Sequence, residues 1–197
     1  RSSNRSFTVD VMINPDETGN SMTFFSHGNR GNSLELGLTE NKRLAVAFND
    51  TTFLSKDTIP FNGLRQVAFV FKADLTEKVT YVTMYDGTKE MGNFRYAKLY
   101  SGVGNLYLGS SQRGNLSNTT NFQGQMLEFR LWNQALNAAQ IGVYAQKKLT
   151  GYELGLLDNY SLSEGRGKFS YNKSPNGNDL QLSGTMWKMP AGMSVKL

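Results

Sequence analysis

The chain has 197 residues, of which 39% are hydrophobic and 12% aromatic, enough to bury the core of one large domain but short for two. It contains no cysteine, which excludes disulfides, thiolate metal sites and thiol enzymes. The net charge of +5 comes from scattered Lys and Arg residues, not from a basic stripe with interleaved aromatics, so we expect no nucleic-acid partner.

The first third of the chain alternates apolar and polar residues with a period of two, the pattern of half-buried strands. The stretch "RQVAFVFK" is apolar on both faces, which predicts a central strand covered on both sides. Clusters of Gly, Asn, Asp and Pro separate these segments, as in an antiparallel sandwich. The alternating stretches "SFTVDVMI", "SLELGL" and "RLAVAF" assign to the core Phe7, Val9, Val11, Ile13, Leu34, Leu36, Leu38, Leu44, Val46 and Phe48.

One short helix is predicted near residues 137–149. Asn137 is suited to cap its start, and Gln140 three residues later completes a capping box. Two lysines would occupy its last turn, and Gly151 follows as a C-terminal stop. The sequence therefore predicts an all-β fold, an antiparallel two-sheet sandwich, with one helix lying against it.

The stretch "GQMLEFRLWN", which begins at Gly124, is predicted to be a strand with Leu127, Phe129 and Leu131 on its core face. Its other face allows two interpretations. An acid, a base and an indole in a row could bind a saccharide by stacking and hydrogen bonding. Alternatively, this face lies under the helix, with the charges paired and the indole used in packing. The residues concerned are Glu128, Arg130 and Trp132.

Two further groups of side chains could bind a ligand from loops. Around the single histidine, amides and a cation could hydrogen-bond sugar hydroxyls. In "GNFRYAKLYSG", aromatic rings either form a stacking platform or are buried on one side of a strand. The first group is His27, Asn29, Arg30 and Asn32, and the second is Phe94, Tyr96 and Tyr100.

The stretch "FQGQMLEFRLWNQALNAAQI" resembles the pattern "G-x-I-x-E-x-R-I-W-N-x-A-L" that ends the sandwich in bacterial laminin G-like domains of the concanavalin A-like lectin and glucanase superfamily. "SFTVDVMINP", "RQVAFVFK" and "LYLGSS" are similar to other strands of that family. The resemblance implies a jelly-roll sandwich that binds a polysaccharide or a glycoprotein glycan. It also implies a secreted or bacterial cell-surface protein.

The segment 153–197 is similar to a family segment that stands before the first strand in many relatives, whereas here it follows the helix. It either closes the sandwich from the C-terminal side or opens a second, truncated domain. We expect the first arrangement, with one domain over residues 1–197. Because the first residue is Arg, we also expect a fragment of a larger protein, with further N-terminal domains and any membrane anchor outside this chain.

Enzymes of this superfamily raise the question of catalysis, but glycoside hydrolysis needs two suitably spaced carboxyl groups. No "E-x-D-x-x-E" run is present, and Arg130 would hold Glu128 ionised, which does not suit a general acid. We therefore expect no catalytic residue and a binding module. The alternatives are a structural spacer and a glycoside hydrolase with an unrecognised carboxylate pair.

Calcium is the candidate cofactor, because relatives often bind it at the rim and loop oxygens suit a hard cation. The spacing matches no defined calcium loop, and Asp and Asn equally serve turns. The candidate donors are Asp16, Glu17, Asn20, Asp50, Asp57 and Asp179.

Overall fold

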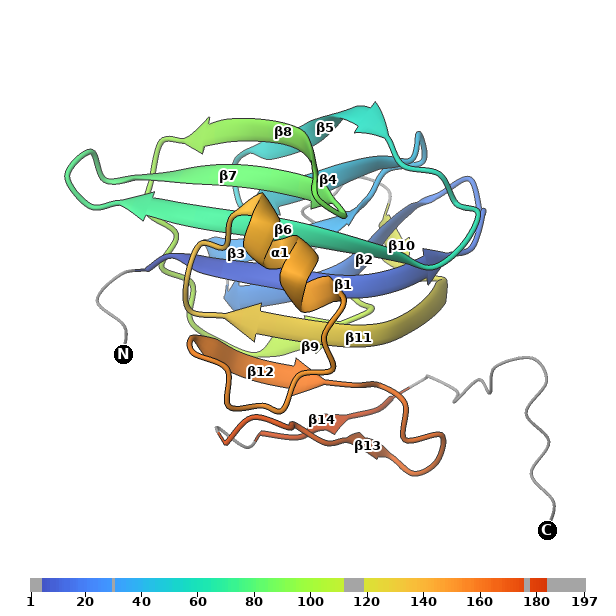
Figure 1. Ribbon diagram of the computed structural model, residues 1–197. Coiled ribbons are helices and arrows are strands. Elements are labelled where there is room, and N and C mark those ends of the chain that lie inside the picture. Colours follow the sequence, from blue (N-terminus) through green and yellow to red (C-terminus); the bar gives the residue numbers. More distant parts are fainter. Residues whose placement is uncertain (1–4, 30, 112–118, 176–177, 184–197) are drawn as a thin grey trace, which may run out of the picture.

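The computed structural model describes residues 5–29, 31–111, 119–175 and 178–183. Two sheets pack face to face (Figure 1). The first has the order β12 (Leu156–Tyr160), β11 (Gly124–Trp132), β1 (Phe7–Pro15), β6 (Arg65–Asp74), β7 (Val79–Asp86) and β8 (Lys89–Tyr96). The second has the order β10 (Thr119–Asn121), β2 (Ser21–Asn29), β3 (Asn32–Leu38), β4 (Arg43–Phe48) and β5 (Thr52–Thr58), and β9 (Leu106–Leu108) also pairs with β2.

The strands pair antiparallel, as predicted, except for a short parallel pairing of β10 with β2. The main core fills the space between the two sheets. All ten apolar positions assigned from the alternating stretches belong to it, nine of them fully buried and Phe7 partly so. The antiparallel β-sandwich predicted from the period-two pattern is therefore confirmed.

Strand β6 lies in the middle of the first sheet, as its two apolar faces predict. Val67, Phe69 and Phe71 face the main core, whereas Ala68 and Val70 face outward. This outer side forms a second apolar cluster with the helix α1 (Ala138–Ala145), which crosses the sheet in Figure 1. The predicted position of the helix against the sandwich is confirmed.

The N-terminus of α1 has the predicted capping box. Asn137 accepts a hydrogen bond from the Gln140 backbone N–H, and the Gln140 side chain accepts one from the Asn137 N–H, both at 2.9 Å. The predicted C-terminus near residue 149 is wrong, because the helix ends at Ala145. Leu149 is buried in the second cluster, so the chain must turn towards the sheet before that residue.

The prediction that Leu127 belongs to the core is also wrong. The pairing of β1 with β11 shifts between Met12 and Ile13, which face Glu128 and Met126. Leu127 is therefore an extra residue in a β-bulge, and the alternation changes phase there. Met126 packs against the core instead, while Leu127 is 38% exposed.

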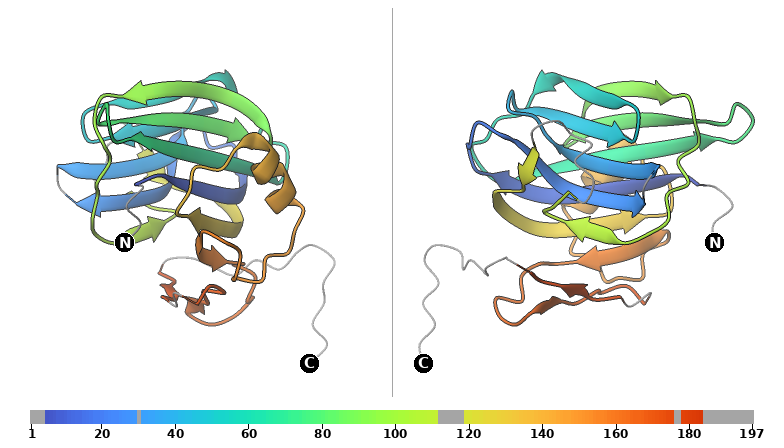
Figure 2. Two further views of the ribbon diagram at one scale, coloured as in Figure 1. Left: turned by 60° about the vertical axis from the view of Figure 1, so that its left-hand side comes forward. Right: turned by 180° about the vertical axis from the view of Figure 1, so that it is seen from behind.

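The segment after the helix adds β12 to the edge of the first sheet, antiparallel to β11. Leu156 packs in the second cluster and Tyr160 in the main core. Two short paired strands, β13 (Phe169–Ser170) and β14 (Leu180–Gln181), lie beyond β12 (Figures 1 and 2).

Candidate functional site

The outer face of β11 is covered by the helix. Trp132 has no exposed surface, and its ring stacks on Tyr144 of α1 at a centroid distance of 4.4 Å. Arg130 is only 2% exposed. These two side chains offer a sugar no surface, so the packing interpretation of this face holds and the saccharide-stacking interpretation is wrong.

Arg130 is the centre of a buried polar network on this face. Its guanidinium donates to Glu128 Oε2 at 2.7 Å and to Asp10 Oδ2 at 3.3 Å. It also donates to the backbone carbonyls of Tyr144 at 2.9 Å and Lys147 at 3.4 Å. These carbonyls belong to the last turn of α1 and the residues after it, and the Tyr144 carbonyl also accepts a hydrogen bond from the Lys147 N–H at 3.2 Å. Arg130 therefore anchors the C-terminal end of the helix to the sheet.

Asp10 completes the network from β1. It accepts a hydrogen bond from Gln66 Nε2 at 2.8 Å as well as the contact from Arg130. Burial raises the pKa of Asp10, and the Arg130 guanidinium acts in the opposite direction. A carboxylate enclosed in this way is a structural element and is out of reach of a glycosidic bond.

The aromatic residues of β8 and the segment after it close one end of the core. Tyr96 is 8% exposed and stacks on Phe48 at 3.9 Å. Phe94 is half-buried and stacks on Phe53 at 5.1 Å. Tyr100 is also buried. Of the two interpretations of these residues, burial applies to Tyr96 and Tyr100, and neither presents a ring face for a sugar.

The histidine group lies at this same end of the sandwich, on the β2–β3 hairpin. His27 Nδ1 is 2.8 Å from the Tyr100 hydroxyl, which donates in turn to the His27 carbonyl at 3.3 Å. Gly28 allows β2 and β3 to lie close together at the hairpin, since a Cβ there would lie 2.3 Å from the carbonyl oxygen of Asn32. Burial holds the pKa of His27 below 6.5, and a hydrogen bond with the Gly104 backbone partly opposes this shift. His27 therefore joins the hairpin to the segment before β9.

The two asparagines of the group frame the hairpin turn. Asn29 and Asn32 are paired in register, Asn29 is exposed, and Asn32 Nδ2 donates to Ser101 Oγ at 3.0 Å. Arg30, the remaining member of the group, lies outside the described residues. The structure thus brings His27, Asn29 and Asn32 together, beside Tyr100 of the aromatic group.

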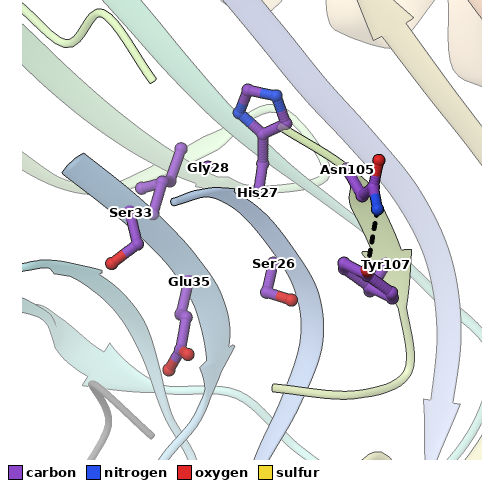
Figure 3. Close-up of a pocket in the computed structure, with 8 residues that line it drawn as sticks. Ser26, His27, Gly28, Ser33, Glu35, Asn105 and Tyr107 are labelled. Carbon is purple, nitrogen blue, oxygen red and sulfur yellow. Dashed lines mark hydrogen bonds between the residues drawn. The ribbon is translucent and has the colours of Figure 1, made fainter. Parts of the chain in front are cut away.

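A shallow depression of about 170 Å³ lies beside this hairpin (Figure 3). Three strands meet beneath it, where Ser26 pairs in register with Glu35 on one side and with Tyr107 on the other. Asn105 stands at the edge and donates to the Tyr107 hydroxyl at 3.0 Å. This volume includes open solvent, so the depression is a shallow surface feature and not an enclosed pocket.

The floor and the rim of the depression differ in exposure. Ser26 and Glu35 are buried, and Glu35 accepts a hydrogen bond from Ser111. Tyr107 is half-buried, and Asn105 is exposed. A ligand would therefore contact the rim, and the buried floor would hold the rim in place. We call Asn105 and Tyr107 the rim site.

The sequence analysis missed Asn105 and Tyr107. The alternation in "NLYLGS" places Tyr107 on the face that points away from the core residues Leu106 and Leu108. This pattern was the signal by which Tyr107 could have been predicted to be accessible. The pairing of β9 with β2 that brings Tyr107 to Ser26 joins residues about 80 positions apart in the chain, and no local pattern encodes it.

The candidate calcium donors are dispersed among local contacts. Glu17 pairs with Lys42, Asp50 with Lys98, and Asp57 with Lys89. Asp179 accepts a hydrogen bond from the Asn172 N–H at 3.0 Å. In the described part of the chain, no three His, Asp or Glu side chains group as metal ligands would. The same part contains no helix that is long and apolar enough to cross a membrane.

Comparisons with known proteins agree with this architecture. A family model described as the concanavalin A-like lectin/glucanases superfamily matches residues 1–142. A comparison with curated proteins gives no match. Among solved structures, a candidate carbohydrate-binding protein from Bacteroides ovatus has a TM-score of 0.67 at 18% identity. It aligns with 92% of this chain, and the chain spans 55% of its length.

Two other solved structures share the fold. A heptameric SAP-like pentraxin from Limulus polyphemus has a TM-score of 0.56 at 16% identity, covering 73% of this chain and 70% of that one. The CBM40 of the Ruminococcus gnavus IT-sialidase, solved with α2,3-sialyllactose, has a TM-score of 0.53 at 18% identity. It covers 71% of this chain and 83% of that one. At these identities the likeness concerns the fold.

Proposed function

The chain belongs to the concanavalin A-like lectin/glucanases superfamily, and from this premise we propose that it is a non-catalytic carbohydrate-binding module that holds a glycan at the rim site. One observation carries the proposal. The exposed amide of Asn105 and the half-buried ring of Tyr107 line a depression beside the β2–β3 hairpin, at one end of a lectin-type sandwich. Amides and hydroxyls pair with sugar hydroxyls, and an aromatic ring offers an apolar face to a pyranose.

The electrostatics of the site favour binding over hydrolysis. Among the described residues that line the depression, Glu35 is the only carboxylate, whereas a glycosidase ordinarily uses two. His27, with its pKa below 6.5, is neutral at physiological pH and is already hydrogen-bonded. The site therefore supplies hydrogen-bonding groups without an acid–base pair.

The proposal extends to the biological setting. We place the module in an extracellular or bacterial cell-surface protein, where glycans are encountered. The length of the Bacteroides ovatus protein, of which this chain spans 55%, is consistent with further domains around such a module. Calcium stays a prediction from the sequence; the exposed carboxylate of Asp50 is paired with Lys98.

The test is affinity electrophoresis of the purified chain in gels that contain plant, fungal or host polysaccharides, each with calcium and with a chelator. We expect retardation by one glycan class. The double variant Asn105→Ala/Tyr107→Ala should lose it, while Asn62→Ala, an exposed amide on the β5–β6 loop at the other end of the sandwich, should keep it. Unchanged mobility of the folded chain in every gel would favour the structural spacer.

A further inference from the structure

A second exposed surface lies in the C-terminal segment, beyond the residues 1–142 that match the family model. From Phe169 to Ser174 the side chains alternate between solvent and the protein. Phe169 is 46% exposed, Tyr171 is 60% exposed, and Lys173 is exposed. Ser170 and Ser174 are buried. Because alternate residues of an extended segment share a face, Phe169, Tyr171 and Lys173 form one outward row, which we call the aromatic stripe.

The inward side chains fix this segment to the sandwich. Asn172 donates to Asp158 Oδ1 at 2.6 Å and accepts hydrogen bonds from the backbone N–H groups of Asn159 and Ser174. Ser170 donates to Glu164 Oε1 at 2.8 Å, and the hydroxyl of Ser174 donates to the Leu157 carbonyl. The backbone behind the stripe is thus held at several points, and a ligand would meet rings whose positions are already set.

The acidic and the basic side chains around the stripe differ in their contacts. The acids of this region are used as internal acceptors: Glu164 binds Ser170 and the Tyr171 N–H, and Asp179 binds the Asn172 N–H. The exposed cations do not take part in ion pairs within the described part of the chain; they are Arg166, Lys168 and Lys173. The outward row itself therefore carries two rings and one cation, Lys173.

The loop that follows the helix extends this surface. Gly151 lies against the backbone of Lys173, since a Cβ there would be 1.9 Å from the Lys173 carbonyl oxygen. The next residue, Tyr152, is 80% exposed. A third exposed aromatic residue thus lies close to the end of the stripe.

We propose that the aromatic stripe binds an extended acidic polysaccharide, a polyuronate, at a surface separate from the rim site. Its members recur about every 7 Å along a line, which suits a repeating chain. The rings of Phe169 and Tyr171 would each stack on a sugar ring of the chain, and Lys173 would pair with a carboxylate. The cations without ion pairs favour this anionic ligand over a neutral one.

The test compares binding of polygalacturonate with binding of its fully methyl-esterified form, by titration calorimetry at low salt. We expect the natural chain to prefer polygalacturonate. Phe169→Ala/Tyr171→Ala should weaken binding about tenfold or more, because both stacking surfaces are lost. Phe169→Tyr/Tyr171→Phe, which keeps two rings, should bind within about twofold of the natural chain. Lys173→Gln should weaken binding of the acid polymer alone.

The substituted side chains are exposed, so all variants should unfold at the same temperature as the natural chain. The rim variant Asn105→Ala/Tyr107→Ala should bind polygalacturonate unchanged, which separates the two surfaces. The proposal is overturned if the natural chain does not bind polygalacturonate, or if the double alanine variant binds it equally well. It is also overturned if sedimentation shows that the stripe joins two copies of the chain.

Discussion

His27 and Arg130 illustrate how tertiary partners decide what a polar side chain does. Histidine and arginine are often found in binding sites, but here both side chains form hydrogen bonds with other groups of the protein. His27 is bonded to Tyr100 and to the Gly104 backbone, and Arg130 to two carboxylates and two carbonyls. Asn29 and Asn105, which remain exposed, are the better candidates for ligand contact.

The first prediction concerns the protonation of His27. Because burial lowers its pKa below 6.5, the unfolded chain binds the proton more readily than the folded chain. The stability that follows is present above pH 6.5 and is lost as the pH falls through the folded-state pKa. NMR can follow this titration without assignment, since the chain has a single histidine.

We expect the His27 ring protons to titrate with a midpoint below 6.5. His27→Gln should remove this part of the pH dependence of the unfolding temperature. A midpoint at or above 6.5 in the folded chain would contradict the burial of the His27 ring beside Tyr100 and the Gly104 backbone.

At the scale of the elements, β11 determines what the first sheet presents on each side. The bulge at Leu127 changes the phase of its alternation, so that Met126 and Phe129 both reach the main core. Beyond the bulge, Arg130 and Trp132 lie under α1. A strand whose outer face carries a helix anchor cannot also serve as a binding face.

The second prediction tests the bulge. Met126→Lys should lower the free energy of unfolding by about 2–3 kcal/mol, because it brings a charge against the core. The neighbouring substitution Leu127→Lys should change it by no more than about 0.5 kcal/mol, because Leu127 faces solvent. Chemical denaturation of the two variants makes the comparison. Equal costs, or a larger cost at Leu127, would mean that the register without the bulge is the true one.

At the scale of the whole molecule, we propose that residues 1–197 form one domain and that the segment 153–197 closes it. Strand β12 supplies the hydrogen bonds that the outer edge of β11 would otherwise lack. It also brings Leu156 to the cluster under the helix, and Tyr160 to Phe129 at a ring distance of 6.2 Å. These contacts favour the closing segment over the start of a second domain.

The third prediction follows from that arrangement. A chain that ends at Thr150 should unfold roughly 10 °C below the full chain, because two buried side chains worth about 2 kcal/mol each are removed. Calorimetry of both chains measures the difference. Identical melting curves would mean that the C-terminal segment contributes nothing to the sandwich and belongs to another unit.

The sequence by itself determined the features that are written in neighbouring residues. Period-two alternation identified the strands and their core faces, the apolar run identified β6 as central, and Asn137 with Gln140 identified the start of the helix. Only the tertiary structure decided the burial of Trp132, the bulge at Leu127 and the rim at Tyr107. These depend on which distant strand or helix packs against each face, and such long-range pairing leaves no local pattern in the chain.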